Sequence, residues 1–249
     1  MSVSVTFRFY EELNDFLPSS RRKVPFMIYV NGNPAVKDVI ESLNVPHPEI
    51  DLILVNGISE GFDYRVREGD FISVYPSFEL FNITGLKKSG KSLRKTKFIL
   101  DVHLGKLARY LRFTGFDSLY RNDYDDDEII RRSVTEHRII LTRDKGILKN
   151  AIVTHGYFVR NQNPRDQLEE VIKKFDLKSE IKPFTRCSSC NGKIKKVPKQ
   201  SVINSLQPLT IRYFNDFYRC TGCGNIYWEG SHFKNISVWL QNLLYNEKT

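Results

Sequence analysis

The sequence has no long hydrophobic run, and this absence excludes the simplest kind of membrane protein. None of its apolar stretches approaches the roughly 20 residues that a transmembrane helix needs. The first residues alternate apolar and polar side chains, as a β-strand does, so we expect no signal peptide. Internal repeats and low-complexity tracts are missing too. We therefore expect a cytoplasmic protein with no membrane partner.

Cysteine is absent outside one short segment. All four cysteines occur there, as the pairs Cys187-x-x-Cys190 and Cys220-x-x-Cys223. A disulfide framework would imply secretion, which nothing else in the sequence supports. Two matched CxxC pairs can supply four thiolates to one tetrahedral ion, whereas a redox pair or chance thiols would not be matched in this way. We predict a structural Zn²⁺ site, carried by a ribbon with an inserted loop.

The sequence also lacks an excess of acidic residues. The 249 residues carry a formal net charge of +9, with a pI of about 9.3. Such a chain fits a polyanionic partner such as RNA, although basic charge also serves solubility alone. With 41% apolar residues, the chain is long enough for two or three domains with cores of their own.

Residues 1–82 have the pattern of a small α+β domain. Apolar alternation and turn residues predict strands at 3–9, 27–30, 52–55 and 71–75, and helical spacing predicts one helix at 36–43. Strand, strand, helix, strand, strand is the order of a β-grasp, or ubiquitin-like, domain. Residues 83–96 are rich in Lys, Arg, Gly and Ser, which predicts a basic linker; phosphate contact is the alternative interpretation.

In residues 97–180, short apolar segments typical of strands alternate with segments whose apolar residues recur at helical spacing. We predict strands at 98–100, 118–120, 139–141 and 157–159, and helices at 104–111, 129–134 and 168–175. This order indicates an α/β domain with a parallel, doubly wound sheet. Residues 181–249 differ, with the cysteine pairs, short strands and a terminal helix, and are interpreted as a zinc ribbon.

Acidic residues follow the strands of the predicted α/β domain. Asp101 comes directly after one strand, and Asp144 comes soon after another. Because ligands bind at the carboxyl ends of strands in such sheets, both aspartates should lie there. A third carboxylate can come from the run 125–128. Clustered carboxylates suit Mg²⁺ or Mn²⁺, which can assist phosphodiester hydrolysis. The alternative is that these residues are turn residues and helix N-caps.

Basic residues accompany the predicted acidic site. Lys106, Arg109 and Arg112 recur at intervals of three on the helix after Asp101, and Arg143 precedes Asp144. We predict that they hold substrate phosphates, with an ordinary solvent-facing surface as the alternative. His103 and His137 are left unassigned.

The predicted ribbon combines basic and aromatic residues. Lysines and arginines alternate there with Tyr213, Phe214, Tyr218, Tyr227 and Trp228. This combination suits single-stranded nucleic acid, through phosphate contacts and base stacking. We expect most of these rings to form the core of the small domain instead.

Several motifs resemble a known family. FILDVHLGKLARYLRFTGFD (98–117), IILTRD (139–144), RCSSCNGKI (186–194) and YRCTGCGNIYWEGSH (218–232) resemble the Mut-seven C-terminal RNase family, which combines a PIN-like nuclease domain with a zinc ribbon. DLILVNG (51–57) and REGDFISVYP (67–76) resemble the ubiquitin-like domain often fused ahead of it. The first resemblance covers about residues 97–245, and together the two resemblances cover nearly the whole chain.

The resemblance implies a PIN-type acidic site. Asp101 and Asp144 match two of its aspartates, and Asp126 is the best match to the second acid, with Asp127 and Glu128 as alternatives. Many PIN proteins carry a further acid at the place occupied here by Lys145 and Gly146. The ubiquitin-like part also resembles the sulfur carriers ThiS and MoaD. Those carriers react through a terminal Gly-Gly, whereas this chain continues past Pro76 without one.

The function expected from residues and resemblance together is a metal-dependent ribonuclease. Its substrate would be single-stranded or structured RNA, with tRNA and rRNA among the candidates, and its cofactors Mg²⁺ or Mn²⁺ and structural Zn²⁺. A non-catalytic RNA-binding or ribosome-associated module with an inert PIN domain is the first alternative. A sulfur-transfer partner is the second. The sequence does not identify a protein partner for the ubiquitin-like domain.

Overall fold

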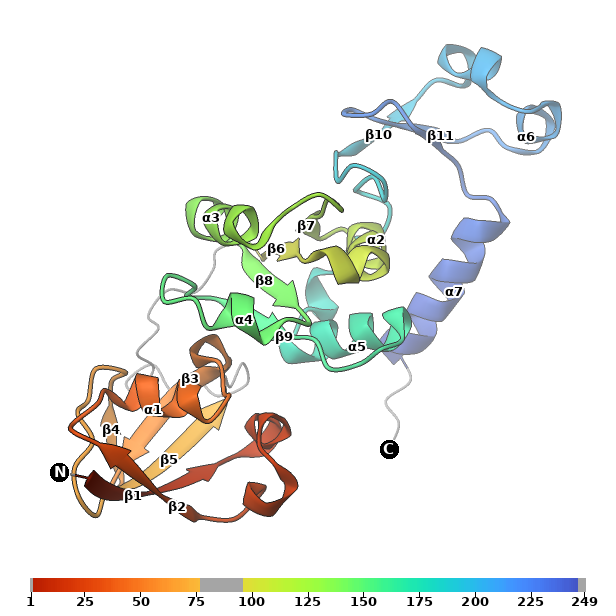
Figure 1. Ribbon diagram of the computed structural model, residues 1–249. Coiled ribbons are helices and arrows are strands. Elements are labelled where there is room, and N and C mark those ends of the chain that lie inside the picture. The colour runs from red at the N-terminus through yellow and green to blue at the C-terminus, as the bar shows by residue number, and fades with distance from the viewer. Residues whose placement is uncertain (1, 77–95, 246–249) are drawn as a thin grey trace. The chain divides into compact units, whose positions relative to one another are not determined.

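The computed structural model describes residues 2–76 and 96–245 (Figure 1). The predicted basic linker at 83–96 lies outside these residues, except for residue 96. The chain forms two compact units, one from residues 1–103 and 123–159 and the other from residues 104–122 and 160–249. Among the described residues, no helix has the length and apolar character needed to cross a bilayer.

The first unit begins with a β-grasp fold, as predicted. Its elements follow in chain order: β1 (Ser2–Phe9), η1 (Glu11–Phe16), η2 (Ser19–Arg21), β2 (Phe26–Asn31), α1 (Val36–Ser42), η3 (His47–Glu49), β3 (Ile50–Val55), β4 (Ile58–Glu60) and β5 (Phe71–Pro76). The five strands form one sheet in the order β2-β1-β5-β3-β4, with β1 parallel to β5 and antiparallel to β2. The short strand β4 was not predicted.

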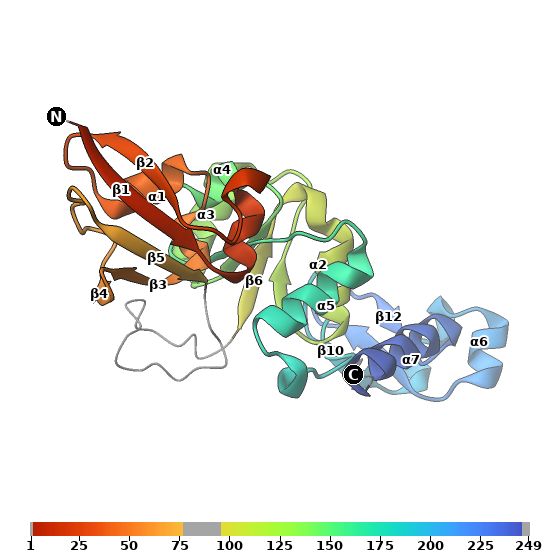
Figure 2. The same ribbon diagram turned by 90° about the horizontal axis from the view of Figure 1, so that it is seen from below.

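The alternating pattern of β1 explains how this part folds. Val5, Phe7 and Phe9 point to one face of the sheet and are at most 1% exposed. Helix α1 covers that face and contributes Val36 and Ile40, both fully buried (Figure 1). Figure 2 shows β1, β2 and β5 side by side, as their registers require.

The first unit continues into three parallel strands. Its remaining elements are β6 (Lys97–Leu100), η4 (Val102–Leu104), α3 (Asp126–Glu136), β8 (Ile139–Thr142), α4 (Lys145–Leu148) and β9 (Gly156–Phe158). Strand β8 pairs with β6 on one side and β9 on the other. Every residue of β8 is buried, which is typical of a parallel strand covered on both faces. The expected parallel sheet is therefore confirmed, and helix α4 is an element that the sequence did not predict.

Within the first unit, the β-grasp residues contact the end of the parallel sheet. The Nε2 atom of His47 lies 2.7 Å from the carbonyl oxygen of Val153, and its Nδ1 atom lies 2.6 Å from Glu41. The buried carboxylate of Glu49 accepts a hydrogen bond from the backbone N–H of Phe158. The Phe158 ring packs edge-on against Phe16. These contacts join η1 and η3 to β9.

The second unit contains the helices and the ribbon that follow. Its elements are α2 (Gly105–Phe113), β7 (Asp117–Leu119), α5 (Pro164–Lys174), η5 (Lys178–Glu180), β10 (Ile194–Val197), η6 (Lys199–Ser201), η7 (Ile203–Ser205), α6 (Pro208–Tyr213), β11 (Phe217–Cys220), β12 (Ile226–Tyr227) and α7 (Ser231–Tyr245). Helices α2 and α5 pack together, and each buries an apolar face (Figure 2). Strands β10, β11 and β12 form an antiparallel ribbon, and η6, η7 and α6 make up the insertion expected between the cysteine pairs.

Candidate functional site

Asp101 and Asp144 lie at the carboxyl ends of two neighbouring strands. Asp101 follows β6 directly, and Asp144 follows β8 after one intervening residue, Arg143. Because β6 and β8 are parallel and paired in register, both aspartates emerge at the same edge of the sheet. This is the edge at which open α/β sheets bind ligands.

Asp101 is held by three hydrogen-bond donors. Its side chain is only 3% exposed, and its Oδ1 atom accepts a hydrogen bond from the backbone N–H of His103, at 2.8 Å. Its Oδ2 atom accepts from the Thr142 hydroxyl and from the backbone N–H of Arg143, the latter at 2.8 Å. Hydrogen bonds of this kind stabilise the charged form of a carboxylate. Asp101 is therefore held in a fixed orientation.

Thr142 connects the two aspartates. It is fully buried at the end of β8, and its hydroxyl both donates to Asp101 and accepts from the backbone N–H of Asp144, at 2.8 Å. The Asp144 side chain caps α4 by accepting from the backbone N–H of Gly146, at 2.7 Å. Asp144 is therefore a helix N-cap at the carboxyl edge of the sheet, and its role as a metal ligand stays a prediction.

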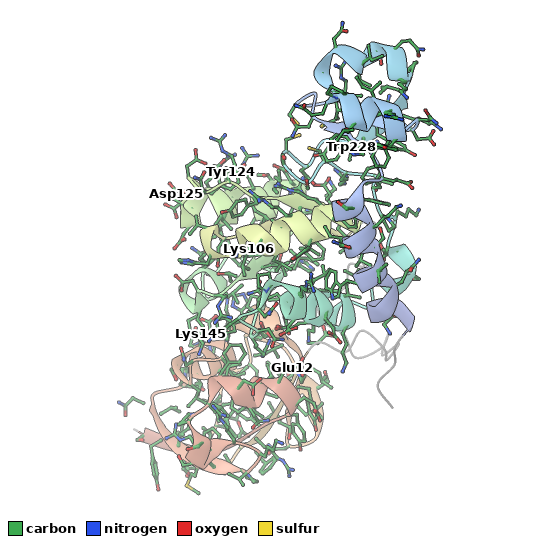
Figure 3. The ribbon with its side chains drawn as sticks, turned by 90° about the vertical axis from the view of Figure 1, so that its right-hand side faces the viewer. Glu12, Lys106, Tyr124, Asp125, Lys145 and Trp228 are labelled. Atoms are coloured by element: carbon green, nitrogen blue, oxygen red, sulfur yellow. The ribbon has the colours of Figure 1, made fainter. Side chains whose placement is uncertain are left out.

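The acidic run divides into residues with different roles. Asp125 caps α3 by accepting from the backbone N–H of Glu128, at 2.8 Å (Figure 3). The Glu128 carboxylate is paired with Arg131 and Arg132 on the same helix. These two acids are therefore occupied by local structure, which leaves Asp126 and Asp127 in the first turn.

Asp126 lies within the electrostatic influence of the other two aspartates. Desolvation raises the pKa of Asp126 above its ordinary value of 3.8, and the negative charges of Asp144 and Asp101 raise it further. A raised carboxyl pKa caused by like charges is characteristic of acids gathered at one site. Asp126 therefore lies close enough to Asp101 and Asp144 for their charges to raise its pKa, and a shared metal site of the three acids stays a prediction.

The three carboxylates are more loosely grouped than the thiols. Among the described residues, the four cysteines alone form a group whose ligand atoms all lie within 4.8 Å of one another. Mg²⁺ commonly binds through one or two carboxylates and keeps several water ligands. The oxygen donors and the mutual repulsion of the acids fit such an ion.

The predicted phosphate-binding residues have different surroundings. Lys106 and Arg109 are exposed on α2. The guanidinium of Arg143 donates to the carbonyl oxygen of Val159, at 3.0 Å. Arg112 was predicted to contact substrate, but its side chain is 3% exposed and is surrounded by carbonyl oxygens. The structure therefore corrects that prediction, because a buried and saturated guanidinium is not available to a phosphate at the surface.

Arg112 supports the first cysteine pair instead. It donates to the carbonyl oxygens of Ser118 and Ser189, at 2.8 Å each, and more weakly to that of Ser188. Ser188 and Ser189 lie between Cys187 and Cys190. Arg112 thereby ties helix α2 to the turn that presents two thiols.

The four cysteines meet at one point of the second unit. The Sγ atoms of Cys187 and Cys223 are 3.5 Å apart, and those of Cys190 and Cys220 are 3.4 Å apart. The spacing fits a tetrahedral ion with Zn–S bonds of about 2.3 Å. This geometry supports the predicted structural zinc site.

Without a cation, the thiols of the cluster differ in their pKa values. Burial raises the pKa of Cys187, but hydrogen bonds from Tyr227 and from the amides of Cys190 and Ser189 outweigh this effect and lower it to about 6. A backbone hydrogen bond at Asn225 lowers the pKa of Cys223, yet burial and the neighbouring thiols raise it to about 12. Four thiolates this close together require a bound cation.

Sequence reasoning missed the role of Thr142. The predicted strand ended at residue 141, and Thr142 was given no role, yet its hydroxyl fixes both Asp101 and Asp144. A hydroxyl residue between a buried strand and an aspartate was the one available signal.

A β-grasp domain, a parallel-sheet domain with acids at its carboxyl edge and a four-cysteine ribbon define a modular α/β protein with a nuclease-like domain. The Mut7-C RNAse domain matches residues 96–240, and the Mut7-C ubiquitin domain matches residues 2–82. The chain belongs to the Mut7-C RNAse domain family. No protein with a curated function matches it.

Solved structures similar to this chain match only a small part of it. A molybdopterin converting factor, subunit 1, from Pyrococcus furiosus is 18% identical, with a TM-score of 0.25, and the match covers 30% of this chain and 99% of that one. SAMP1 from Haloferax volcanii is 19% identical, with a TM-score of 0.24, and the match covers 30% of this chain and 96% of that one.

The cysteine cluster predicts one tightly bound zinc ion per chain. Cys220→Ser should release that ion, because three thiolates and a hydroxyl bind zinc much more weakly than four thiolates. Metal analysis of the purified proteins by mass spectrometry measures the zinc content. Ser201→Ala, elsewhere in the same ribbon, is the control and should keep its zinc. Equal zinc content in the Cys220→Ser and wild-type proteins would contradict the assignment.

The raised pKa of Asp126 predicts a pH-dependent gain in stability when its charge is removed. A carboxyl group whose pKa is higher in the folded than in the unfolded state favours folding when protonated, and this contribution is lost as pH rises through the folded-state pKa. Asp126→Asn should therefore raise the melting temperature of zinc-loaded protein at pH 7, in buffer without Mg²⁺ or Mn²⁺. The gain should shrink as pH falls through the raised folded-state pKa of Asp126 and should be lost below about 4.

Thermal melting followed by circular dichroism measures this effect. Asp127→Asn, on the same helical turn, is the matched control for a general change in charge. If the two variants gained equally at pH 7, the repulsion would be a property of the whole run and not of Asp126 at the acidic site.

Proposed function

We propose that this protein is a metal-dependent ribonuclease whose acidic site consists of Asp101, Asp126 and Asp144. The observation that carries the proposal is the position of Asp101 and Asp144 at the carboxyl edge of β6 and β8, together with the raised pKa of Asp126, which desolvation and the charges of Asp144 and Asp101 cause. Membership of an RNAse domain family supports RNA as the substrate.

The proposed chemistry assigns a part to each residue. Asp101, Asp126 and Asp144 would hold Mg²⁺ or Mn²⁺, which when bound would supply an activated water and stabilise charge on the phosphodiester. Asp101 offers a carboxylate fixed by Thr142 and by two backbone amides, so that it needs little reorganisation when a cation binds. Asp126 and Asp144 complete the negative site. The two CxxC pairs suit a reducing compartment, which is the basis for also proposing a cytoplasmic location.

The non-catalytic alternative has an observation in its favour. The place where the resemblance implies a further acid is occupied by Lys145, whose ammonium group lies 5.0 Å from the centre of the Phe16 ring and 5.6 Å from that of Phe158. The acidic group therefore lacks one member at this place. Under this alternative, the protein binds RNA with a steep salt dependence and does not cleave it.

Cleavage of a labelled RNA pool by zinc-loaded protein tests the proposal. With Mn²⁺ or Mg²⁺ present, the wild-type protein should cleave, and Asp126→Asn should lose about 100-fold or more in rate, as when a charge-stabilising group is removed from other active sites. Asp101→Asn should lose at least as much. Omitting the divalent ion should abolish cleavage.

Asp127→Asn is the matched control, because it removes an equal charge from the same helical turn. It should cleave at nearly the wild-type rate. Wild-type rates in Asp126→Asn and Asp101→Asn would overturn the assigned site, and bound but intact RNA at every divalent ion would favour the non-catalytic alternative.

A further inference from the structure

The second unit contains a cavity of about 660 Å³ that the acidic site does not use. Helix α2, the segment before the first cysteine pair and the segment from β12 into α7 enclose it. Its volume lies within the range of roughly 300–1,000 Å³ that is typical of small-ligand sites. Every lining residue belongs to this unit, so the cavity is a property of the ribbon and its supporting helices.

Aromatic side chains make up much of the wall. Six of them line the cavity, and each is half-buried: Tyr110, Phe113, Phe184, Tyr227, Trp228 and Phe233. Phe184 and Phe233 contact each other, with their ring centres 4.6 Å apart. A closed core would bury such rings completely, as it buries Phe217. The cavity rings instead keep part of their surface accessible, while some of them also pack together.

The rim of the cavity is positively charged. Lys106 and Arg109 extend from exposed positions on α2, and no Asp or Glu is among the described residues that line the cavity. The third lining cation, Arg186, is paired with Asp117 at 3.0 Å. Figure 3 labels Lys106 on α2 and Trp228 between the ribbon and α7. Two exposed cations therefore lie beside an aromatic wall without a lining carboxylate.

One wall is attached to the cysteine cluster. The Tyr227 hydroxyl lies 2.9 Å from the Sγ atom of Cys187, and Ser188 and Ser189 of the first cysteine pair line the same cavity. Arg112 donates hydrogen bonds to the carbonyl oxygens of these two serines. The four-cysteine cluster thus fixes one aromatic ring and two hydroxyl groups at the cavity wall.

We propose that this cavity binds an unpaired nucleobase of single-stranded RNA, with the adjoining phosphates on Lys106 and Arg109. Flat aromatic faces stack on a base, exposed cations attract its phosphates, and serine hydroxyls offer hydrogen bonds to the base edge. The choice of RNA rests on the proposed function. The zinc ribbon is then a substrate-selecting element that favours single-stranded over paired RNA.

The two tryptophans of the chain allow a direct binding test. Trp239 does not line the cavity, so Trp239→Phe leaves Trp228 as the one fluorescent indole. Titration of this zinc-loaded variant with a short oligoadenylate, without Mg²⁺ or Mn²⁺, should quench its fluorescence to saturation. Inorganic polyphosphate should quench little. Equal quenching by polyphosphate would show charge binding alone and overturn the base pocket.

Cavity variants test the stacking partner by the anisotropy of labelled oligoadenylate. Trp228→Leu should weaken binding about 10-fold, within the range measured for loss of a stacking ring, and Trp228→Phe should largely retain it. Tyr213→Leu is the matched control, because its ring is 67% exposed in the same ribbon but outside the cavity. Wild-type affinity in Trp228→Leu would overturn the proposal.

Charge variants separate the rim from the overall basicity of the chain. Lys106→Ala should weaken binding and reduce its salt dependence, whereas Lys195→Ala, exposed on β10 outside the cavity, should have a smaller effect. Equal losses would overturn the assigned rim. If the cavity bound RNA but the protein cleaved none with any divalent metal, the proposed function alone would be wrong. If Trp228→Leu bound RNA with wild-type affinity and the protein still cleaved it, the proposed cavity site alone would be wrong.

Discussion

Repulsion between carboxylates at the edge of a parallel sheet is the constraint on which the site depends. Asp101 is almost fully buried, and its charge is supported by Thr142, Arg143 and His103 through backbone and hydroxyl donors. Desolvation raises the pKa of Asp126, and the charges of Asp144 and Asp101 raise it further. We therefore expect the charge of Asp126 to lower the stability of the fold and a bound cation to offset this loss, as is common at functional sites.

The four cysteines pose the same physical problem in the second unit. Thiols whose pKa values separate to about 6 and about 12 cannot all ionise without a cation. Two residues connect this cluster to its surroundings. Arg112 donates hydrogen bonds to the first cysteine pair, and Tyr227 contacts Cys187 and lines the aromatic cavity. In the proposed account, a group of carboxylates that binds Mg²⁺ or Mn²⁺ carries out the chemistry, and the four-cysteine cluster supports the substrate-binding cavity.

Much of the fold was predictable because the local patterns agree with the tertiary structure. The alternation in β1 predicts a strand with one buried face, the apolar run of β8 predicts a buried strand, and the two CxxC pairs predict a four-cysteine cluster. Thr142 was missed because its partner Asp101 is 41 residues away in the sequence. Arg112 was misassigned because each step of three residues falls about 60° short of a full helical turn, so it lies about 120° around α2 from Lys106. Contacts with distant backbone carbonyls leave no periodic signal.

Binding of Mn²⁺ to the acidic group tests the central claim most directly. Electron paramagnetic resonance of free Mn²⁺, titrated with zinc-loaded protein, counts the bound ions and gives their affinity. The account predicts saturable binding by the wild-type protein that is weakened at least 10-fold in Asp126→Asn and is unchanged in Asp127→Asn. Wild-type Mn²⁺ affinity in Asp126→Asn would show that the three aspartates do not form one cation site.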